Sequence, residues 1–137
     1  MAIYQTACTI FKQNLLNGDE DFTTGSYKIA LYTSFANLGS DTLVYTTDNE
    51  ITGTGYTAGG KALTNIAPAS ANNISYISFA NVTWNPASFT AAGALIYNAT
   101  TSAAVCVLSF GSDKTATSTF TITFPAATST TAVIRLN

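Results

Sequence analysis

Few residues in this chain of 137 could carry out chemistry. It contains no histidine, two cysteines and seven acidic side chains. Without histidine it lacks a Ser-His-Asp triad, a Cys-His pair and imidazole metal ligands. A serine nucleophile with a lysine base would need a Ser-x-x-Lys motif, and the sequence has none. These absences weigh against an enzyme.

The carboxylates offer two further kinds of site. Glycosidases need two carboxylates held a few ångströms apart, and the acidic tract Asp19-Glu20-Asp21 resembles a ligand set for Ca²⁺. The tract lacks the alternating ligand spacing of an EF-hand loop, so a solvated turn is the simpler interpretation. We expect no catalytic residue, no metal and no cofactor among the seven acids, which are Asp19, Glu20, Asp21, Asp41, Asp48, Glu50 and Asp113.

A glycine-rich segment, 53–60, reads GTGYTAGG. It resembles a phosphate-binding loop only in its glycine content, because Lys61 is followed by Ala62 and the pattern is not GxGxxG. The segment therefore predicts a loop or bulge whose glycines adopt positive φ or allow close backbone approach.

Aromatic side chains could form a sugar-stacking platform. The candidates are Trp84, Tyr45, Tyr56, Tyr76 and Tyr97. Aromatic residues on strands are more often core residues or interface anchors, which is the interpretation we favour.

The two cysteines do not form a CxxC pair. Cys106 lies in the apolar run 103–108, where a thiol packs as a small hydrophobic group. We expect Cys8 and Cys106 to be free thiols, with a disulfide as the alternative, in a protein made in a reducing cytoplasm.

The composition excludes several functions. Five basic side chains against seven acidic ones give no basic patch for nucleic acid. No apolar run is long enough to span a membrane, and the first residues do not resemble a secretion signal. Only 9% of residues are charged, whereas 36 of 137 are Thr or Ser. The surface is therefore polar mainly through hydroxyl groups.

One helix and several strands are predicted. Cys8, Phe11 and Leu15 share a face of a helix over 6–17, which Thr6 caps and Gly18 ends. Strands are expected over 27–34, 43–45, 74–79 with an extension through 82–84, 93–98, 103–110, 120–124 and 132–136. Residues 61–66 lead out of the glycine-rich loop, Asn85-Pro86 breaks a strand, and 98–102 and 111–114 form turns.

This spacing predicts an all-β fold for a single domain over 1–137. About eight short strands, with turns every 8–12 residues and one short N-terminal helix, are typical of a β-sandwich, either a jelly roll or immunoglobulin-like. Periodicity does not give the strand order.

Four segments resemble a family of small structural proteins of tailed bacteriophages. They are KQNLLNGDEDFTTGSYKIALYTS (12–34), NEITGTGYTAGGKALT (49–64), GALIYN (93–98) and VLSFGSDKTATSTFTITFP (107–125). TGTGYTAGGK is the most specific of these. The chain is most similar in character to capsid cement or decoration proteins, and the resemblance supplies no catalytic residue.

The resemblance implies a non-enzymatic virion protein made in the bacterial cytoplasm. It would bind the major capsid protein on the capsid exterior as a homo-oligomer, a dimer or trimer. The alternative is a tail, baseplate or fibre component that binds host glycan. Contacts would use aromatic anchors and edge strands at the N-terminal arm 1–6 or the final strand 132–137. The candidate interface residues are Ile3, Tyr4, Tyr56, Trp84, Tyr97, Ile134 and Leu136.

Overall fold

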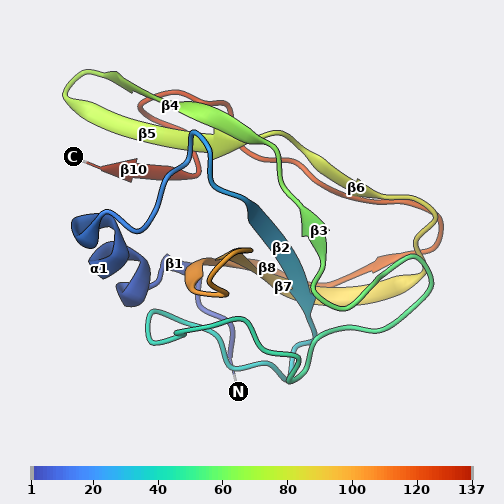
Figure 1. Cartoon of the computed structure of the whole chain (residues 1–137). Helices are drawn as coiled ribbons and strands as arrows, with labels where there is room; N and C mark the ends of the chain where they lie inside the picture. Colours follow the sequence, from blue (N-terminus) through green and yellow to red (C-terminus); the bar gives the residue numbers. More distant parts are fainter. Residues whose placement is uncertain (1, 137) are drawn as a thin grey trace.

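The computed structural model describes residues 2–136 and confirms an all-β, sandwich-like fold with one short helix (Figure 1). In chain order the elements are β1 (Thr6–Ala7), α1 (Thr9–Asn17), β2 (Tyr27–Tyr32), β3 (Lys61–Ala62), β4 (Asn65–Ala71), β5 (Ile74–Phe79), β6 (Val82–Trp84), β7 (Phe89–Asn98), β8 (Ala104–Ala116), β9 (Phe120–Ile122) and β10 (Ile134–Leu136).

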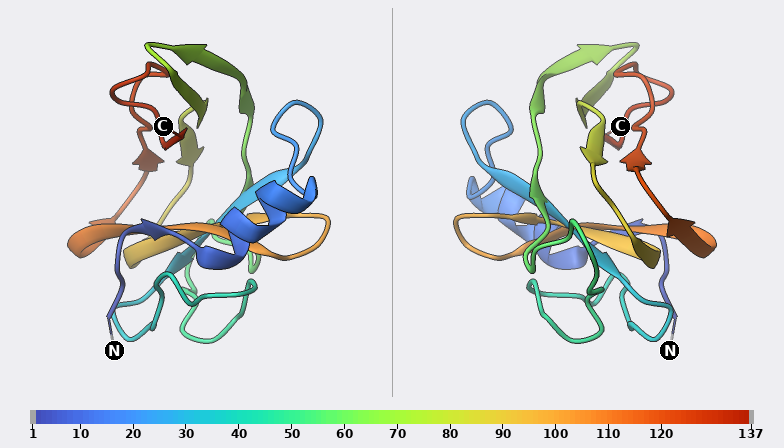
Figure 2. Two further views of the ribbon diagram at one scale, coloured as in Figure 1. Left: turned by 90° about the vertical axis from the view of Figure 1, so that its left-hand side faces the viewer. Right: turned by 90° about the vertical axis from the view of Figure 1, so that its right-hand side faces the viewer.

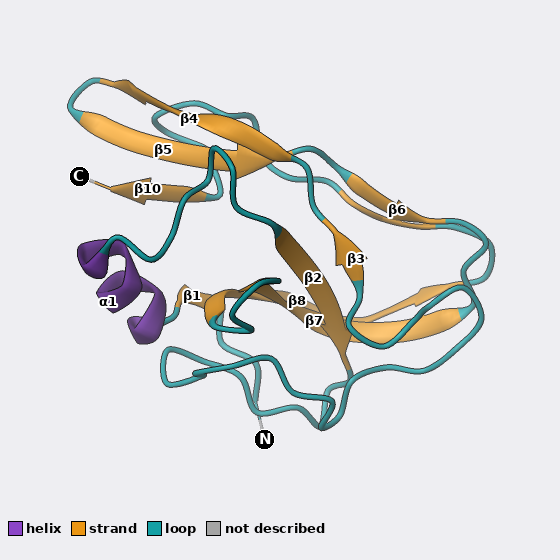
Figure 3. Cartoon of the chain, in the orientation of Figure 1, coloured by secondary structure: helices purple, strands orange, loops and turns teal. Residues whose placement is uncertain are grey.

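The strands form three antiparallel units. The main sheet has the order β1-β8-β7-β2-β3, the second sheet has the order β10-β5-β4, and β6 pairs with β9. Seen nearly edge-on, the main sheet lies between the second sheet on one side and a long irregular segment on the other (Figure 2). That segment, the loop layer, comprises residues 33–60 and is drawn mainly as loop in Figure 3.

The central strands of the main sheet, β2 and β7, are buried on both faces along most of their length. Tyr27 on β2 stacks on Phe22 at 4.5 Å and lies 6.2 Å from the Phe79 ring of β5, so this face meets the second sheet. Tyr32 donates a hydrogen bond to the Thr46 carbonyl at 2.6 Å, so the alternate residues meet the loop layer. The alternation of apolar and polar residues over 27–34 predicts a half-buried strand. That prediction is wrong, because loops cover the face that an antiparallel sheet commonly leaves to water.

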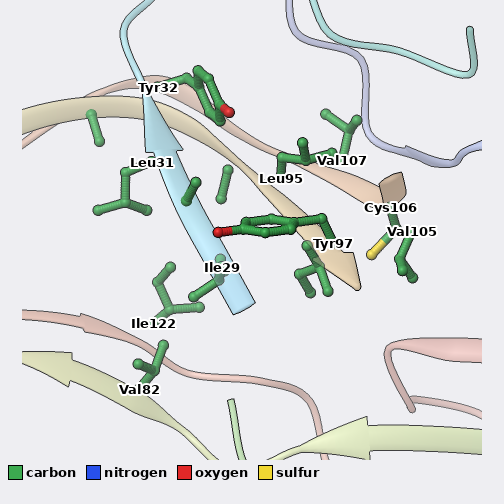
Figure 4. Packing of buried hydrophobic residues seen from close by; sticks show 14 of the residues in the cluster. Ile29, Leu31, Tyr32, Val82, Leu95, Tyr97, Val105, Cys106, Val107 and Ile122 are labelled. Carbon is green, nitrogen blue, oxygen red and sulfur yellow. The ribbon is translucent and has the colours of Figure 1, made fainter. Parts of the chain in front are cut away.

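The core between the layers is apolar and rich in aromatic rings. Ile29 of β2 faces Val82 of β6 and Ile122 of β9 (Figure 4). The Trp84 ring meets the Phe89 and Phe120 rings edge-on, at 6.3 and 6.0 Å. These contacts join the main sheet to the β6–β9 pair, and the Tyr27–Phe79 contact joins the second sheet to the same core.

The helix begins later than the sequence predicts. Thr6 and Ala7 are extended and pair with Val107 and Cys106, so Thr6 does not cap the helix. Cys8 occupies the N-cap position without a side-chain cap. Pairing with β8 satisfies the backbone groups that a further helical turn would have used. Gly18 ends the helix as predicted, with a left-handed φ of 79°.

Several predicted strands have different bounds. The proposed strand over 43–45 is a loop with one bridge, from Val44 to Ala103, so that prediction is wrong. The strand expected over 74–84 is two strands in different sheets, β5 and β6. The residues that follow the glycine-rich loop lead into β4. This strand pairs with β5, with a bulge between Ile66 and Ala69. The final strand keeps only three residues, Ile134–Leu136.

The predicted turn over 111–114 lies inside β8. That strand runs from Ala104 to Ala116 and pairs with β7 on both sides of an irregularity between Ala91 and Gly93. Four residues of β8, 110–113, stand opposite Ala92 alone, and Gly111 has φ 80°. The turn residues therefore form a bulge that bends the strand without ending it.

The glycine-rich segment is a loop with left-handed glycines, as predicted. Gly55 and Gly60 have φ 87° and 80°. A Cβ on Gly60 would lie 1.8 Å from the Ile29 carbonyl oxygen, and one on Gly55 would lie 1.8 Å from that of Pro86. These positions need glycine both for backbone conformation and for close approach, of Gly60 to β2 and of Gly55 to the β6–β7 connection.

Comparing Gly60→Ala with Gly111→Ala tests whether Gly60 packs closely against the Ile29 backbone. Both glycines have φ 80°, but a Cβ on Gly111 meets nothing within 4 Å. Gly111→Ala is expected to lower the free energy of unfolding by about 1–2 kcal/mol, the cost of a left-handed alanine. Gly60→Ala should cost about 2 kcal/mol more, since backbone must move. Equal losses in urea denaturation would contradict the close packing of this loop.

Candidate interaction surface

Glu50 is the centre of a hydrogen-bond network that fixes the loop layer to the main sheet. Its carboxylate accepts hydrogen bonds from the Tyr45 hydroxyl at 2.6 Å, the Tyr56 hydroxyl at 2.5 Å and the Gly59 N–H at 2.8 Å. The Tyr56 oxygen in turn accepts from the Leu31 N–H of β2 at 2.9 Å. Both carboxylate oxygens are thus occupied by structural donors.

The tyrosines of the loop layer contact aromatic rings of the strands and are not presented as an open platform. The Tyr45 and Tyr97 rings stack at 4.7 Å, and the Tyr97 hydroxyl donates to the Gly59 carbonyl at 2.6 Å. Trp84 is only 3% exposed. These aromatic residues act as core and loop anchors in the described structure, which is the interpretation that the sequence favoured over sugar stacking.

Burial keeps the tyrosine hydroxyls of this network protonated. Loss of hydration raises the pKa of Tyr32, Tyr45 and Tyr56 well above the ordinary value, and the negative charge of Glu50 adds to each shift. Neutral hydroxyls remain hydrogen-bond donors to a carboxylate. The network is therefore suited to hold structure at ordinary pH.

The acidic tract also has structural partners. Glu20 Oε1 accepts hydrogen bonds from the Tyr27 hydroxyl and the Asn98 amide, both at 2.9 Å. The Asp21 carboxylate accepts from the Thr23 N–H at 2.8 Å and the Thr24 hydroxyl at 2.9 Å, and these bonds lower the pKa of Asp21. Among residues 2–136 no group of three or more Cys, Asp or Glu side chains could hold a metal ion.

Both cysteines are free and buried, as the sequence predicts. Burial raises the pKa of Cys8 to about 11 and that of Cys106 to about 12. The thiolate is the reactive form of cysteine, so both side chains behave as inert core groups.

Only some of the seven candidate interface residues are exposed at the surface. Tyr97 is 5% exposed and Trp84 is buried, so neither offers an anchor on the surface. Ile3, Tyr56 and Ile134 are partly buried against the core, whereas Tyr4 and Leu136 are 65% and 50% exposed. Aromatic type alone does not distinguish a core residue from a surface anchor, which explains this correction.

Four exposed apolar side chains lie on the loop layer and the N-terminal arm, and we call them the loop face: Tyr4, Phe35, Leu43 and Val44. Tyr4 is a predicted interface residue, whereas the sequence prediction does not include the other three. The four are among the seven large apolar side chains that are exposed in the described part of the chain. The sequence signal for Leu43 and Val44 is the run LVY at 43–45, which predicts a strand.

Backbone hydrogen bonds hold the N-terminal arm and one turn of the loop layer in place. The Tyr4 N–H donates to the Leu38 carbonyl at 2.9 Å, which docks the N-terminal arm on the loop layer. The Thr42 N–H donates to the Gly39 carbonyl at 3.1 Å, closing the turn that leads to Leu43. Asp41 and Asp48 are exposed in the same layer, and residues 29–60 contain no Lys or Arg.

A groove opens on the other side of the main sheet. It has a volume of about 720 Å³ and lies between β8, β9 and the C-terminal segment, with Phe110 and Val133 among its apolar lining residues. Lys114 and Arg135 also line it, and both are exposed. No acidic side chain lines this groove or the hollow next to it, which shares Gln5 and Arg135.

Comparisons with known proteins give no relative. No family model, no curated protein and no solved structure matches the chain. In the described residues, no helix is long and apolar enough to cross a membrane.

Glu50→Gln tests the network. The substitution replaces one acceptor oxygen with an amide that faces donors, so the free energy of unfolding should fall by about 1–3 kcal/mol. Asp48→Asn is the matched control, since Asp48 is exposed on the same loop, and it should change stability by less than about 0.5 kcal/mol. Chemical denaturation of both variants measures the difference, and equal effects would contradict a structural role for Glu50.

Alkaline pH should destabilise the fold. The pKa values of Cys8, Cys106, Tyr32, Tyr45 and Tyr56 are raised, so the folded chain holds protons that the unfolded chain releases. Their stabilisation is complete below the ordinary pKa values of 9.0 and 10.0 and is lost as pH rises beyond them.

Denaturation curves at increasing pH check this expectation. Tyr56→Phe removes one of the titrating groups, so the variant should lose stability less steeply above the ordinary tyrosine pKa. An unchanged slope would show that Tyr56 does not titrate with unfolding.

Proposed function

We propose that this chain is a capsid cement or decoration protein of a tailed bacteriophage. It binds the major capsid protein on the outside of the head, has no catalytic activity and acts as a homo-oligomer. The observation that carries the proposal is the loop face, where four large apolar side chains are exposed on a chain of few charges. Exposed apolar patches mark interaction sites on proteins of this size.

The state of the reactive groups supports a binding role. Glu50 is occupied by two tyrosine hydroxyls and a backbone N–H, and Glu20 by a tyrosine and an asparagine. Both thiols are buried with raised pKa values. These groups stabilise loops and core, which leaves the exposed surface as the functional part of the molecule.

The chemistry of the surface fits binding to a lattice. Interfaces are depleted of charged residues at their centre and enriched in aromatic residues. The loop face carries two aromatic residues, Tyr4 and Phe35. A capsid repeats the same site many times, so a modest contact per subunit gives a large total when the copies are linked in an oligomer.

Copy number in purified particles tests this function. A cement protein should occur in a number comparable to that of the major capsid protein, because every lattice position offers the same site. Quantitative mass spectrometry of purified virions measures the ratio. A few copies per particle would overturn the cement role and favour a tail component.

Salt provides the second measurement. Binding through an apolar surface should persist at high ionic strength, whereas binding between exposed charges is screened over about 10 Å at 0.1 M salt. Particles washed in high salt should therefore retain the protein, and its release by moderate salt would contradict an apolar interface.

A further inference from the structure

The groove between β8, β9 and the C-terminal segment lies where the three strand units meet without pairing. On its outer side β8 pairs with β1 only at Val107 and Cys106, whereas β9 and β10 each pair with a single strand. Beyond those two residues, the Gln5 side chain accepts a hydrogen bond from the Ser109 N–H at 3.2 Å. The junction leaves a groove of about 720 Å³, which is within the size range of sites for small ligands.

Positive charge gathers in this groove. Lys114 and Arg135 line it and no acidic side chain does, although the chain carries seven acids and only five bases. Arg135 Nη1 donates a hydrogen bond to the Thr130 carbonyl at 2.8 Å, which orients the guanidinium and leaves its other N–H groups for a ligand. A groove lined by one sign of charge attracts ligands of the opposite sign, so this lining favours an anion.

The uncharged lining combines apolar side chains with hydroxyl and amide groups. Leu108, Phe110 and Val133 are half-buried there, and the Phe110 ring packs against the Phe120 ring at 6.1 Å between centroids. The polar lining residues include Gln5, Ser109, Thr121, Thr123 and Thr131. A saccharide presents C–H faces that pack on an aromatic ring and hydroxyls that exchange hydrogen bonds with such groups. The lining therefore suits a sugar better than a bare inorganic anion.

An acidic peptide strand fits this groove less well. Strand addition needs an open, regular edge, and β8 is bulged over 110–113 with Gly111 at φ 80°. Lys114 follows directly on the same strand. The other two edges, β9 and β10, have three residues each. Bulges, lysines and short length are features that prevent strand addition.

We propose that this groove binds an acidic saccharide, a short chain of sugar units that carry carboxylates. Lys114 and Arg135 bind the carboxylates, and Phe110 packs against the face of one sugar ring. The side chains of Gln5 and Thr123 hydrogen-bond to the sugar hydroxyls. This activity goes beyond capsid binding, because the groove shares no residue with the loop face and lies on the other side of the main sheet (Figure 2).

Isothermal titration calorimetry of the full chain with trigalacturonate tests the proposal. Maltotriose is the matched control, because it has the same number of sugar rings and no carboxylate. Trigalacturonate should bind at least about tenfold more tightly than maltotriose, and more weakly as salt rises, because the contact includes charge pairs. Equal binding of the two sugars, or no binding of trigalacturonate at millimolar concentration, would overturn the proposal.

Two further probes separate the saccharide from other anions. Inorganic phosphate and a hexaglutamate peptide carry negative charge without a sugar ring. Each should bind at least about tenfold more weakly than trigalacturonate, because neither can use the ring and hydroxyl contacts. Phosphate that binds as tightly as trigalacturonate would reduce the groove to a simple anion site, and hexaglutamate that does so would make it a peptide site. Either result overturns the assignment to a saccharide.

Lys114→Gln and Lys12→Gln form a matched pair of variants. Each removes one positive charge from an exposed lysine, but Lys12 lies on α1, outside the groove. Lys114→Gln should raise the dissociation constant of trigalacturonate about tenfold, whereas Lys12→Gln should change it by less than about twofold. Equal effects would show that net charge alone attracts the ligand and would contradict the groove. Because these measurements use the isolated chain, their failure is distinguishable from a failure of capsid binding.

Phe110→Leu tests the ring contact. The leucine keeps an apolar side chain beside Phe120 but has no flat face for a sugar, so trigalacturonate should bind about threefold or more weakly. Urea denaturation establishes that the variant is folded. Unchanged affinity in the folded variant would contradict the contact between Phe110 and the saccharide.

Discussion

The central strands of the main sheet are buried on both faces, and the rest of the structure depends on how the second face is covered. The first face meets another sheet, whose backbone groups are paired within their own ladders. The second face meets irregular chain, whose polar groups must find partners over an apolar surface. The Glu50 carboxylate provides them, because it accepts hydrogen bonds from two tyrosines and a backbone N–H of the same loop layer.

This cover also creates the exposed apolar surface. The loop layer turns Tyr45, Tyr56 and Ile51 toward the sheet. Its outer turns leave Phe35, Leu43 and Val44 exposed. The N-terminal arm adds Tyr4 through its contact with Leu38. The segment that covers the sheet is thus also the segment that carries the proposed interaction surface.

Hydroxyl side chains provide the polar interactions on the strand surfaces that charged side chains provide in most domains. Thr83 pairs with Thr121 across β6 and β9 at 3.1 Å, and Thr90 with Thr115 across β7 and β8 at 2.8 Å. β-branched residues fit the pleated sheet, and cross-strand threonine pairs stabilise it. The low charge of the chain therefore does little to destabilise the strands. It also means that few charged groups would lose their hydration if this surface contacted another protein.

The sequence by itself determined the all-β class, the helix end at Gly18, the free thiols, the glycine-rich loop and the alternation of Phe120 and Ile122, because these follow from local conformation or periodicity. Only the tertiary structure decided that Trp84 and Tyr97 are buried, that 43–45 is an exposed loop and that 111–114 bulges within β8. The local sequence shows which residues are apolar. Contacts between segments that are distant in the sequence decide which of those residues are buried and which are exposed.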